Sequence, residues 1–177
     1  MQWSIDAAHS TVEFRVRHMG IATVRGQFKT FEARAELDDE DALQGLEATI
    51  DVKSIDTGVS QRDEHLRSPD FFDADRFGDI TFRSRAVVAD GANRYQVTGD
   101  LTIRDVTRPV TLAIEVTDIV TDPWGNRRIA GEASTVINRK DFGLTWNQVL
   151  EMGALLVGED VRVHLEVEAV APQEAAV

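Results

Sequence analysis

The sequence SIDTGVSQRDEHLRSPDFFDADRFGDITF, residues 54–82, is the one long interruption in a chain that otherwise alternates apolar and polar residues. Ser60 stands where a helix N-cap is expected, and Asp63 follows three residues later, a pattern that satisfies the free N–H groups of a first helical turn. Ser68 and Pro69 repeat the signal, because proline is favoured at the first position of a helix. The stretch therefore predicts a short helix at Ser60 and a second helical start at Ser68.

Phe71, Phe72 and Phe77 place three large apolar rings in the second half of this stretch. Rings of that size are most stable in a buried environment. In a chain made of strands, that environment is the mouth or the interior of a barrel. We therefore interpret residues 54–82 as a helical lid over one end of a barrel, and we expect the functional site beneath it.

Eight segments outside the lid alternate apolar and polar side chains with period two, as half-buried strands do. They are residues 10–18, 23–37, 46–52, 80–88, 95–104, 110–116, 127–138 and 161–167. The second segment changes its apolar face near Thr30, which predicts a bulge or a bend there. Residues 146–152, between the last two segments, are interpreted as a second short lid element.

Eight amphipathic strands with mostly short connections predict an all-β fold. We expect a closed, eight-stranded antiparallel up-and-down barrel, with the helical lid between the third and fourth strands, because closure removes the exposed edges of such a sheet. A β-sandwich is the alternative. Residues 1–170 are expected to form this single domain, and residues 171–177 a frayed tail.

Small residues occupy predicted inward positions on six of the strands: Gly26, Ala48, Ala86, Gly99, Gly131 and Ala133. An eight-stranded barrel is just wide enough either to fill with side chains or to hold one ligand. The small residues therefore predict unfilled space in the lumen. The alternative is a solid core in which small and large side chains alternate to fit the taper of the barrel.

Composition and charge narrow the classes of partner. The 177 residues include 19 Lys and Arg against 31 Asp and Glu, so the net charge is −12, a field that repels nucleic acids and anionic lipid surfaces. The absence of cysteine excludes disulfides, thiolate zinc sites and a cysteine nucleophile. The sequence has neither a signal peptide nor a stretch long enough to span a membrane. We expect a cytoplasmic protein without stable membrane insertion, or a periplasmic or secreted one if a leader was removed.

Several motifs resemble one known family. They are D-x-x-H-S-x-V-x-F at residues 6–14, S-I-D-T-G at 54–58, R-D-x-H-L at 62–66 and I-N-R-x-D-F-G at 137–143, with shorter matches at 71–73, 80–84, 99–103 and 106–110. Together they resemble the YceI family, and the sequence departs from its usual pattern at two turn positions, Gly78 and Asp105. The resemblance implies a lipocalin-like barrel that binds, stores or transports a long amphiphilic lipid, such as a polyisoprenoid or an isoprenoid quinone, in its lumen.

Ten residues on inward strand faces or in the lid are candidates for contact with the lipid tail: Phe14, Val16, His18, Phe28, Ile50, Phe72, Phe82, Gly99, Leu101 and Leu112. Six residues near strand or lid ends are candidates for a head group such as a diphosphate, a carboxylate or a quinone oxygen: His9, Arg62, His65, Asn138, Arg139 and Trp146. For His18 the alternative is a core histidine whose ring bonds a backbone carbonyl. For Asn138 and Arg139 it is a structural cap, and for His9, Arg62 and His65 a solvated surface role.

Other functions use some of the same residues. An acid–base isomerase could pair the inward His18 with Asp6, and a metal could bind His9, His18 and His65 with Asp63, although the spacing matches no metal-binding motif. A stress-protective protein without a ligand is a third alternative. We expect a binding protein that is not an enzyme and has no cofactor and no bound metal, and we leave open whether it forms a homodimer.

Overall fold

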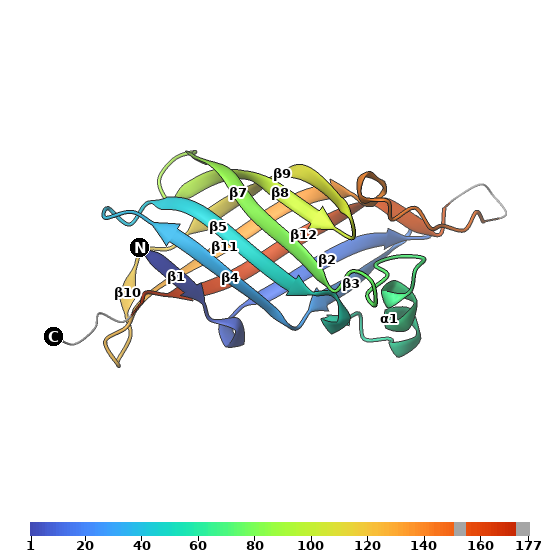
Figure 1. Ribbon diagram of the computed structural model, residues 1–177, viewed down its shortest axis with the longest axis horizontal. Helices are drawn as coiled ribbons and strands as arrows, with labels where there is room; N and C mark the ends of the chain where they lie inside the picture. Colours follow the sequence, from blue (N-terminus) through green and yellow to red (C-terminus); the bar gives the residue numbers. More distant parts are fainter. Residues whose placement is uncertain (151–154, 173–177) are drawn as a thin grey trace.

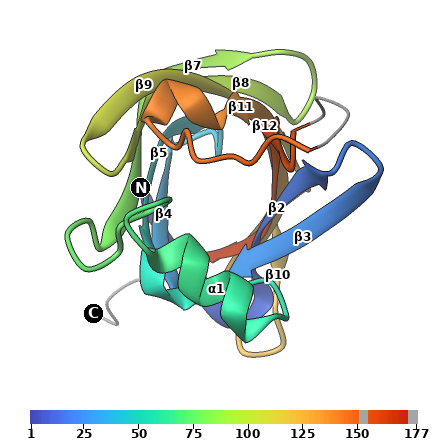
Figure 2. The ribbon, with the colours of Figure 1, turned by 90° about the vertical axis from the view of Figure 1, so that its right-hand side faces the viewer.

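The computed structural model describes residues 1–150 and 155–172 as a closed antiparallel barrel (Figures 1 and 2). Twelve labelled strands form one sheet, and pairing of β11 with β12 closes it. The ring contains eight strand positions, two of which are shared by consecutive short strands. In chain order they are β1 with β2 (Gln2–Ile5, Thr11–His18), β3 with β4 (Ala22–Phe28, Phe31–Leu37), β5 (Leu43–Asp51), β7 (Asp79–Ala89), β8 (Arg94–Ile103), β9 (Val106–Val116), β11 (Arg127–Asn138) and β12 (Val157–Val170). The predicted eight-stranded up-and-down barrel is confirmed.

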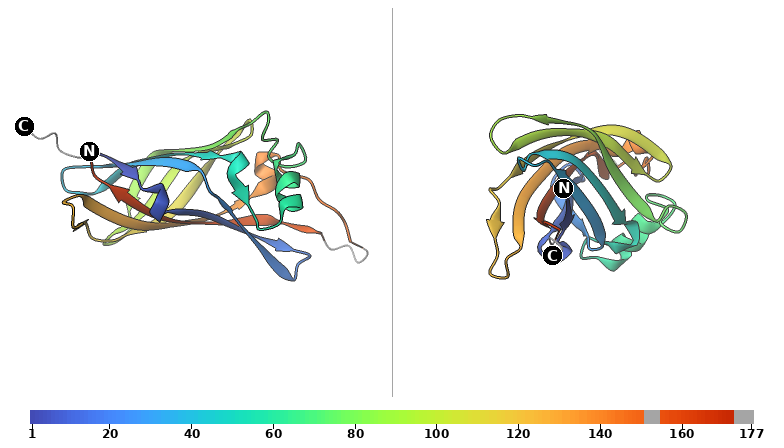
Figure 3. Two further views of the ribbon diagram at one scale, coloured as in Figure 1. Left: turned by 90° about the horizontal axis from the view of Figure 1, so that it is seen from below. Right: turned by 60° about the vertical axis from the view of Figure 1, so that its left-hand side comes forward.

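The remaining elements are short. They are β6 (Ile55–Asp56), β10 (Val120–Thr121), the helix α1 (Ser60–Arg67) and three 3-10 helices, Ala7–His9, Val52–Ser54 and Arg139–Phe142. Among the described residues, no helix is long and apolar enough to cross a membrane. Figure 3 shows the N-terminus and the end of β12 at one end of the barrel and α1 at the other. We call these the terminal end and the lid end.

The strands β1 to β4 differ from the two strands predicted for this part of the chain. The chain leaves the sheet between β3 and β4, so the expected bend near Thr30 is present. The strand β1 was not predicted, because four residues are too few to establish a period. It pairs with β4 and β12 and carries Trp3, whose side chain is completely buried.

The predicted capping of the lid helix is wrong. The N-cap of α1 is Val59, which makes no side-chain cap hydrogen bond. Asp63 instead accepts hydrogen bonds from the backbone N–H and the hydroxyl of Thr57, at 2.9 and 2.6 Å, so it fixes the loop before the helix. The hydroxyl of Ser68 donates to the carbonyl of His65 at 2.6 Å. Ser68 therefore closes α1, and no second helix begins there.

The second lid element was expected over residues 146–152. The described part, residues 146–150, contains an isolated bridge between Val149 and Leu155 and no helix. Residues 151 and 152 lie outside the described residues, as do residues 173–177 of the predicted frayed tail.

A bulge in β7 reverses one of the predicted faces. The register between β7 and β8 shifts between Ser84 and Ala86. As a result, Ala86 and Val88 are exposed, and Val87 packs against the core. The prediction that Ala86 faces the lumen is therefore wrong.

Two of the inward glycines are covered by aromatic rings and do not leave open space. A methyl group added at Gly26 would lie 2.2 Å from the ring of Phe14. One added at Gly99 would lie 2.6 Å from the ring of Phe82 and 2.5 Å from the carbonyl oxygen of Arg83. Glycine at these positions lets a ring lie flat across the neighbouring strand, so the empty part of the lumen is elsewhere.

Candidate functional site

An apolar cavity of about 430 Å³ runs through the barrel between two buried clusters. Its volume falls within the range typical of small-molecule sites. Nine of the ten predicted tail-contact residues line it: Phe14, Val16, His18, Phe28, Ile50, Phe72, Phe82, Leu101 and Leu112. Gly99 does not, because the ring of Phe82 covers it. The cavity has the size and the lining of a site for an apolar ligand.

Trp3 belongs to the apolar packing at the terminal end of the barrel. Its side chain is 0% exposed, and the guanidinium of Arg127 lies 5.4 Å from the centre of its ring. Leu37 and Leu43 are buried in the same cluster and line the cavity, and the lining reaches Asp41 in the turn between β4 and β5. Apolar side chains therefore make up most of the cavity wall at this end.

Aromatic rings from α1 and two loops meet at the lid end. His65 packs edge-on against Trp146 and Phe71, with ring centres 4.6 and 5.1 Å apart. The Nε2 atom of His65 lies 2.8 Å from a carboxylate oxygen of Asp70, which orients the imidazole. His65, Phe71 and Trp146 all line the cavity. This cluster joins the lid to the segment that precedes β12.

Three arginines also line the cavity at this end: Arg17, Arg62 and Arg139. Arg62 donates from Nε and Nη2 to the hydroxyl and the carbonyl of Thr57, at 2.7 and 2.9 Å. These bonds hold the side chain in place and leave Nη1 without a hydrogen-bond partner among the described residues. Arg62 is thus a fixed cation with one donor group available to an anionic or carbonyl oxygen.

Arg139 is buried, with 4% of its surface exposed. It donates to the carbonyl oxygens of Leu144, Trp146 and Gly158 at 2.6, 2.9 and 2.8 Å. Burial lowers the pKa of its guanidinium, but an arginine remains charged in proteins. No described carboxylate forms an ion pair with it. Arg139 therefore holds the loop together and adds positive charge near the cavity mouth.

Asn138 is a structural cap, which was the alternative to a role in head-group binding. Its side-chain oxygen accepts from the N–H of Lys140 at 3.0 Å and so caps the 3-10 helix Arg139–Phe142. It does not line the cavity. The predicted role in head-group binding has no support from its position.

His18 lines the cavity near the lid end, and no described group hydrogen-bonds its ring. The proposed isomerase pair with Asp6 is not brought together. His18 pairs with Val157 of β12, whereas Ile5, the residue before Asp6, pairs with Ala169. Twelve residues of extended strand separate these positions, roughly 40 Å.

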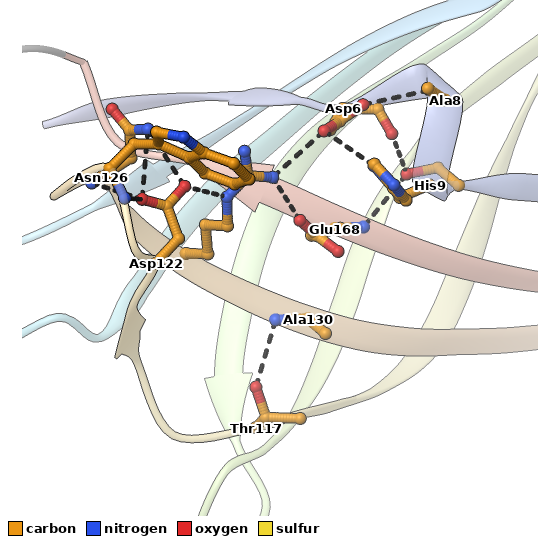
Figure 4. Close-up of polar contacts among 11 residues, drawn as sticks. Asp6, Ala8, His9, Thr117, Asp122, Asn126, Ala130 and Glu168 are labelled. Atoms are coloured by element: carbon orange, nitrogen blue, oxygen red, sulfur yellow. Dashed lines mark hydrogen bonds and ion pairs between the residues drawn. The ribbon is translucent and has the colours of Figure 1, made fainter.

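His9 was expected near a head group but lies in a polar network away from the lid end (Figure 4). Its Nδ1 atom is 3.0 Å from a carboxylate oxygen of Asp6. Arg128 donates to Asp6 at 3.1 Å, to Asp122 at 2.7 Å and to Glu168. The network ties the turn before β11 to the first strand and to β12.

The charges in this network stabilise the fold. The hydrogen bond from Arg128, together with that from Asn126, holds the pKa of Asp122 well below its usual range. Hydrogen bonds from His9 and Arg128 likewise lower the pKa of Asp6. Both carboxylates are therefore ionised and paired at neutral pH.

The same network contains the one group of metal-ligating side chains with suitable spacing in the described part of the chain, Asp6, His9 and Glu168, whose ligand atoms lie within 4.8 Å of one another. Arg128 already bonds both carboxylates. The set imagined from the sequence, in which Asp63 joins three histidines, is not assembled, since Asp63 is committed to Thr57.

Sequence reasoning overlooked several cavity residues although their signal was present. The predicted inward face of the last strand supplies Val161, Val163, Leu165 and Val167, all of which line the cavity. Leu66 of α1 and Leu144 of the following loop were not predicted, because a single apolar residue in a short helix or loop has no period.

Comparison with known proteins identifies the family. A family model described as the YceI-like domain matches residues 3–169. The chain belongs to this family. A UPF0312 protein of Staphylococcus aureus (strain N315) is 35% identical over 168 residues, which cover 94% of this chain and 95% of the relative.

Several solved structures share the fold. BcnA of Burkholderia cenocepacia superimposes with a TM-score of 0.81 at 27% identity, covering 93% of this chain and 98% of BcnA. The YceI protein of Campylobacter jejuni gives a TM-score of 0.77 at 28% identity, covering 89% and 90% of the two chains. A domain of Saccharophagus degradans, described as polyisoprenoid-binding, gives 0.71 at 17% identity, covering 96% and 98%.

Proposed function

We propose that this YceI protein binds a long-chain amphiphilic lipid of the isoprenoid class in its cavity, and thereby stores or transports it. The observation that carries the proposal is the cavity itself, about 430 Å³ in volume and lined almost wholly by apolar side chains. Such a surface favours hydrocarbon, since each buried methylene contributes about 0.8 kcal/mol. The polyisoprenoid-binding domain of Saccharophagus degradans has the same fold, which agrees with this ligand class.

The arrangement of the two ends supports an amphiphile in one orientation. Buried Trp3 and its neighbours make the terminal end apolar, whereas Arg62 offers a fixed donor at the lid end. Arg139 adds a charge that no described carboxylate pairs with. We therefore place the tail toward Trp3 and an oxygen-rich head group near Arg62 and the imidazole of His18.

A binding role also accounts for the site better than a catalytic one. His18 lines the cavity, and no described carboxylate pairs with it. General acid–base chemistry requires a second group within hydrogen-bond reach of the reacting atoms. The cytoplasmic location and the homodimer stay predictions.

Uptake of a fluorescent polyprenyl analogue tests the proposal. The analogue should bind at micromolar concentration or below, and unlabelled isoprenoids should displace it. A short-chain phosphate that resembles the head group alone should not. If neither the analogue nor natural isoprenoids bind, the cavity is not a lipid site and the proposal is wrong.

A further inference from the structure

The turn between β2 and β3 places apolar side chains where the backbone favours other residues. Met19 and Gly20 have φ angles of 54° and 70°, and Ile21 N–H donates to the carbonyl of His18 at 3.2 Å. His18 pairs with Ala22, so three residues connect the strands, and the two central residues of the β-turn have positive φ, which favours Asn or Gly. Met19 is 41% exposed and Ile21 is 79% exposed. Neither the turn nor the core requires these apolar side chains.

The hairpin stands at the lid end of the barrel. Met19 N–H donates to the carbonyl of Leu156 at 2.8 Å, and the adjacent His18 lines the cavity. Figures 2 and 3 show β2 and β3 projecting from the barrel wall next to the mouth. Val59 and Val149, which are 47% and 68% exposed, lie in other loops at this end. The tip of the hairpin is thus part of an apolar rim around the entrance.

A row of arginines crosses the outer face of the same hairpin. Arg162 of β12 lies directly opposite Arg15 of β2, which lies opposite Arg25 of β3. Arg17 follows on the same face of β2, and all four side chains are exposed. None of the four forms an ion pair with a described residue. Two acidic residues share this face: Glu13, one row further from the tip and opposite Gln27 and His164, and Asp160, two residues before Arg162 on β12.

The row of arginines should destabilise the folded protein, so its presence needs a reason other than folding. Like charges directly opposite one another on neighbouring strands are destabilising, and the chain carries an overall charge of −12. A charge on an edge strand can block pairing with another sheet. That role fits Arg25, whose part of β3 has one sheet neighbour, but not Arg15 or Arg162 in interior strands.

We propose that the β2–β3 hairpin docks this protein on an anionic phospholipid bilayer. Met19 and Ile21 enter the boundary between head groups and acyl chains, while Arg15, Arg17 and Arg162 contact lipid phosphates. The four arginines outnumber Glu13 and Asp160 on this face, and screening limits the reach of the remaining acidic residues to about 10 Å at 0.1 M salt. Docking sets the cavity mouth against the membrane without inserting the barrel. Met19, Ile21, Arg15 and Arg162 do not line the cavity, although Arg17 does. The proposal therefore does not depend on which ligand the cavity holds.

Vesicle co-sedimentation tests the docking directly. The protein should bind vesicles of phosphatidylcholine with phosphatidylglycerol, and bind vesicles of phosphatidylcholine alone at least tenfold more weakly. Arg15→Gln with Arg162→Gln should weaken binding to the anionic vesicles by about fivefold for each arginine and flatten its salt dependence. Met19→Asn with Ile21→Thr should weaken it by about tenfold or more, while keeping the turn, because Asn suits a positive φ.

The matched control is Arg34→Gln with Arg108→Gln, two exposed arginines on β4 and β9 without ion pairs in the described chain. It makes the same change in net charge and should leave vesicle binding within twofold of the wild type. An equal loss in the control, or no binding to anionic vesicles at millimolar lipid, overturns the proposal. The proposal is also overturned if the protein binds duplex DNA more tightly than anionic vesicles and if Met19→Asn with Ile21→Thr leaves that DNA binding unchanged. Uptake of the polyprenyl analogue in vesicle-free buffer is measured in parallel, so a failure to dock is distinguished from a failure to bind lipid.

Discussion

Replacing Ala48 by phenylalanine should shorten the cavity while leaving its mouth unchanged. Ala48 lies in the middle of β5, lines the cavity and pairs with Ala33 and Phe82. The added ring occupies about the space of one five-carbon prenyl unit. At about 0.8 kcal/mol for each buried carbon, less the cost of ordering the chain, one unit contributes roughly 2–4 kcal/mol, or about 30- to 700-fold in affinity.

The assay is a series of prenyl chains of increasing length, each measured by displacement of the fluorescent analogue. For the wild type, affinity should rise with each unit until the cavity is full and then stay level. For Ala48→Phe, the affinity should stop rising about one prenyl unit earlier than for the wild type. Longer chains should bind up to the calculated factor more weakly, and the affinity for short chains should not change.

The matched control is Ala113→Phe, the same substitution at an exposed residue of β9 that does not line the cavity. It should keep the wild-type dependence on chain length. Circular dichroism confirms that both variants fold. If folded Ala48→Phe shows the same level at the same chain length as the wild type, the tail does not reach this part of the barrel and our assignment of the cavity is refuted.

Three further variants test other parts of the structure. Gly99→Ala should lower the free energy of unfolding by about 1–3 kcal/mol, because its methyl group would lie 2.5 Å from a backbone carbonyl; Gly131→Ala, with its closest approach at 3.3 Å, should cost less in the same urea titration. Arg62→Ala should weaken an anionic isoprenoid by about 1.5–3 kcal/mol more than its neutral alcohol, and equal losses would show that Arg62 only positions the lid. Arg128→Gln should destabilise the protein at pH 7. Because the pKa of Asp122 is lowered in the folded state, its contribution to stability is complete above pH about 4 and is lost as the pH falls further. The difference between wild type and Arg128→Gln in urea midpoint should therefore shrink from pH 7 to pH 3, and a constant difference would contradict this pairing.

Strand periodicity was enough to predict the barrel, because every long strand has one face on the lumen and one in solvent. Nine of the ten residues predicted to contact the tail line the cavity, and eight of these nine were chosen from strand periodicity, Phe72 of the lid being the exception. Periodicity failed where a bulge shifts the alternation of side chains or where a strand is too short to show it. The bulge in β7 moves Ala86 outward, and β1 is too short to show a period although it buries Trp3.

The polar residues were harder to place, because their partners come from distant parts of the chain. Asp63 has the spacing of a helix cap, yet Thr57 offers two donors before the helix begins. His9 and His65 both follow turn-like sequences, but one binds Asp6 away from the lid and the other Asp70 within it. Which end of a barrel a loop residue occupies depends on strand order, and a pattern of residue types does not reveal it.

The glycines illustrate a second limit. A small residue on an inward face indicates either empty space or a neighbour that fills it, and the sequence alone does not distinguish the two. Phe14 covers Gly26 and Phe82 covers Gly99, whereas Ala48 and Ala133 border the cavity itself. Only the register between strands shows which side chain lies across which position.

The central claim is that the cavity holds a long-chain lipid. The most direct measurement is mass spectrometry of an organic extract from protein purified without detergent, with Ala48→Phe and Ala113→Phe purified in parallel. The account predicts an isoprenoid-class lipid at close to one molecule per protein in the wild type and in Ala113→Phe, and a shorter chain or markedly less lipid in Ala48→Phe. An extract without lipid, from protein that also fails to take up any prenyl chain, would contradict it.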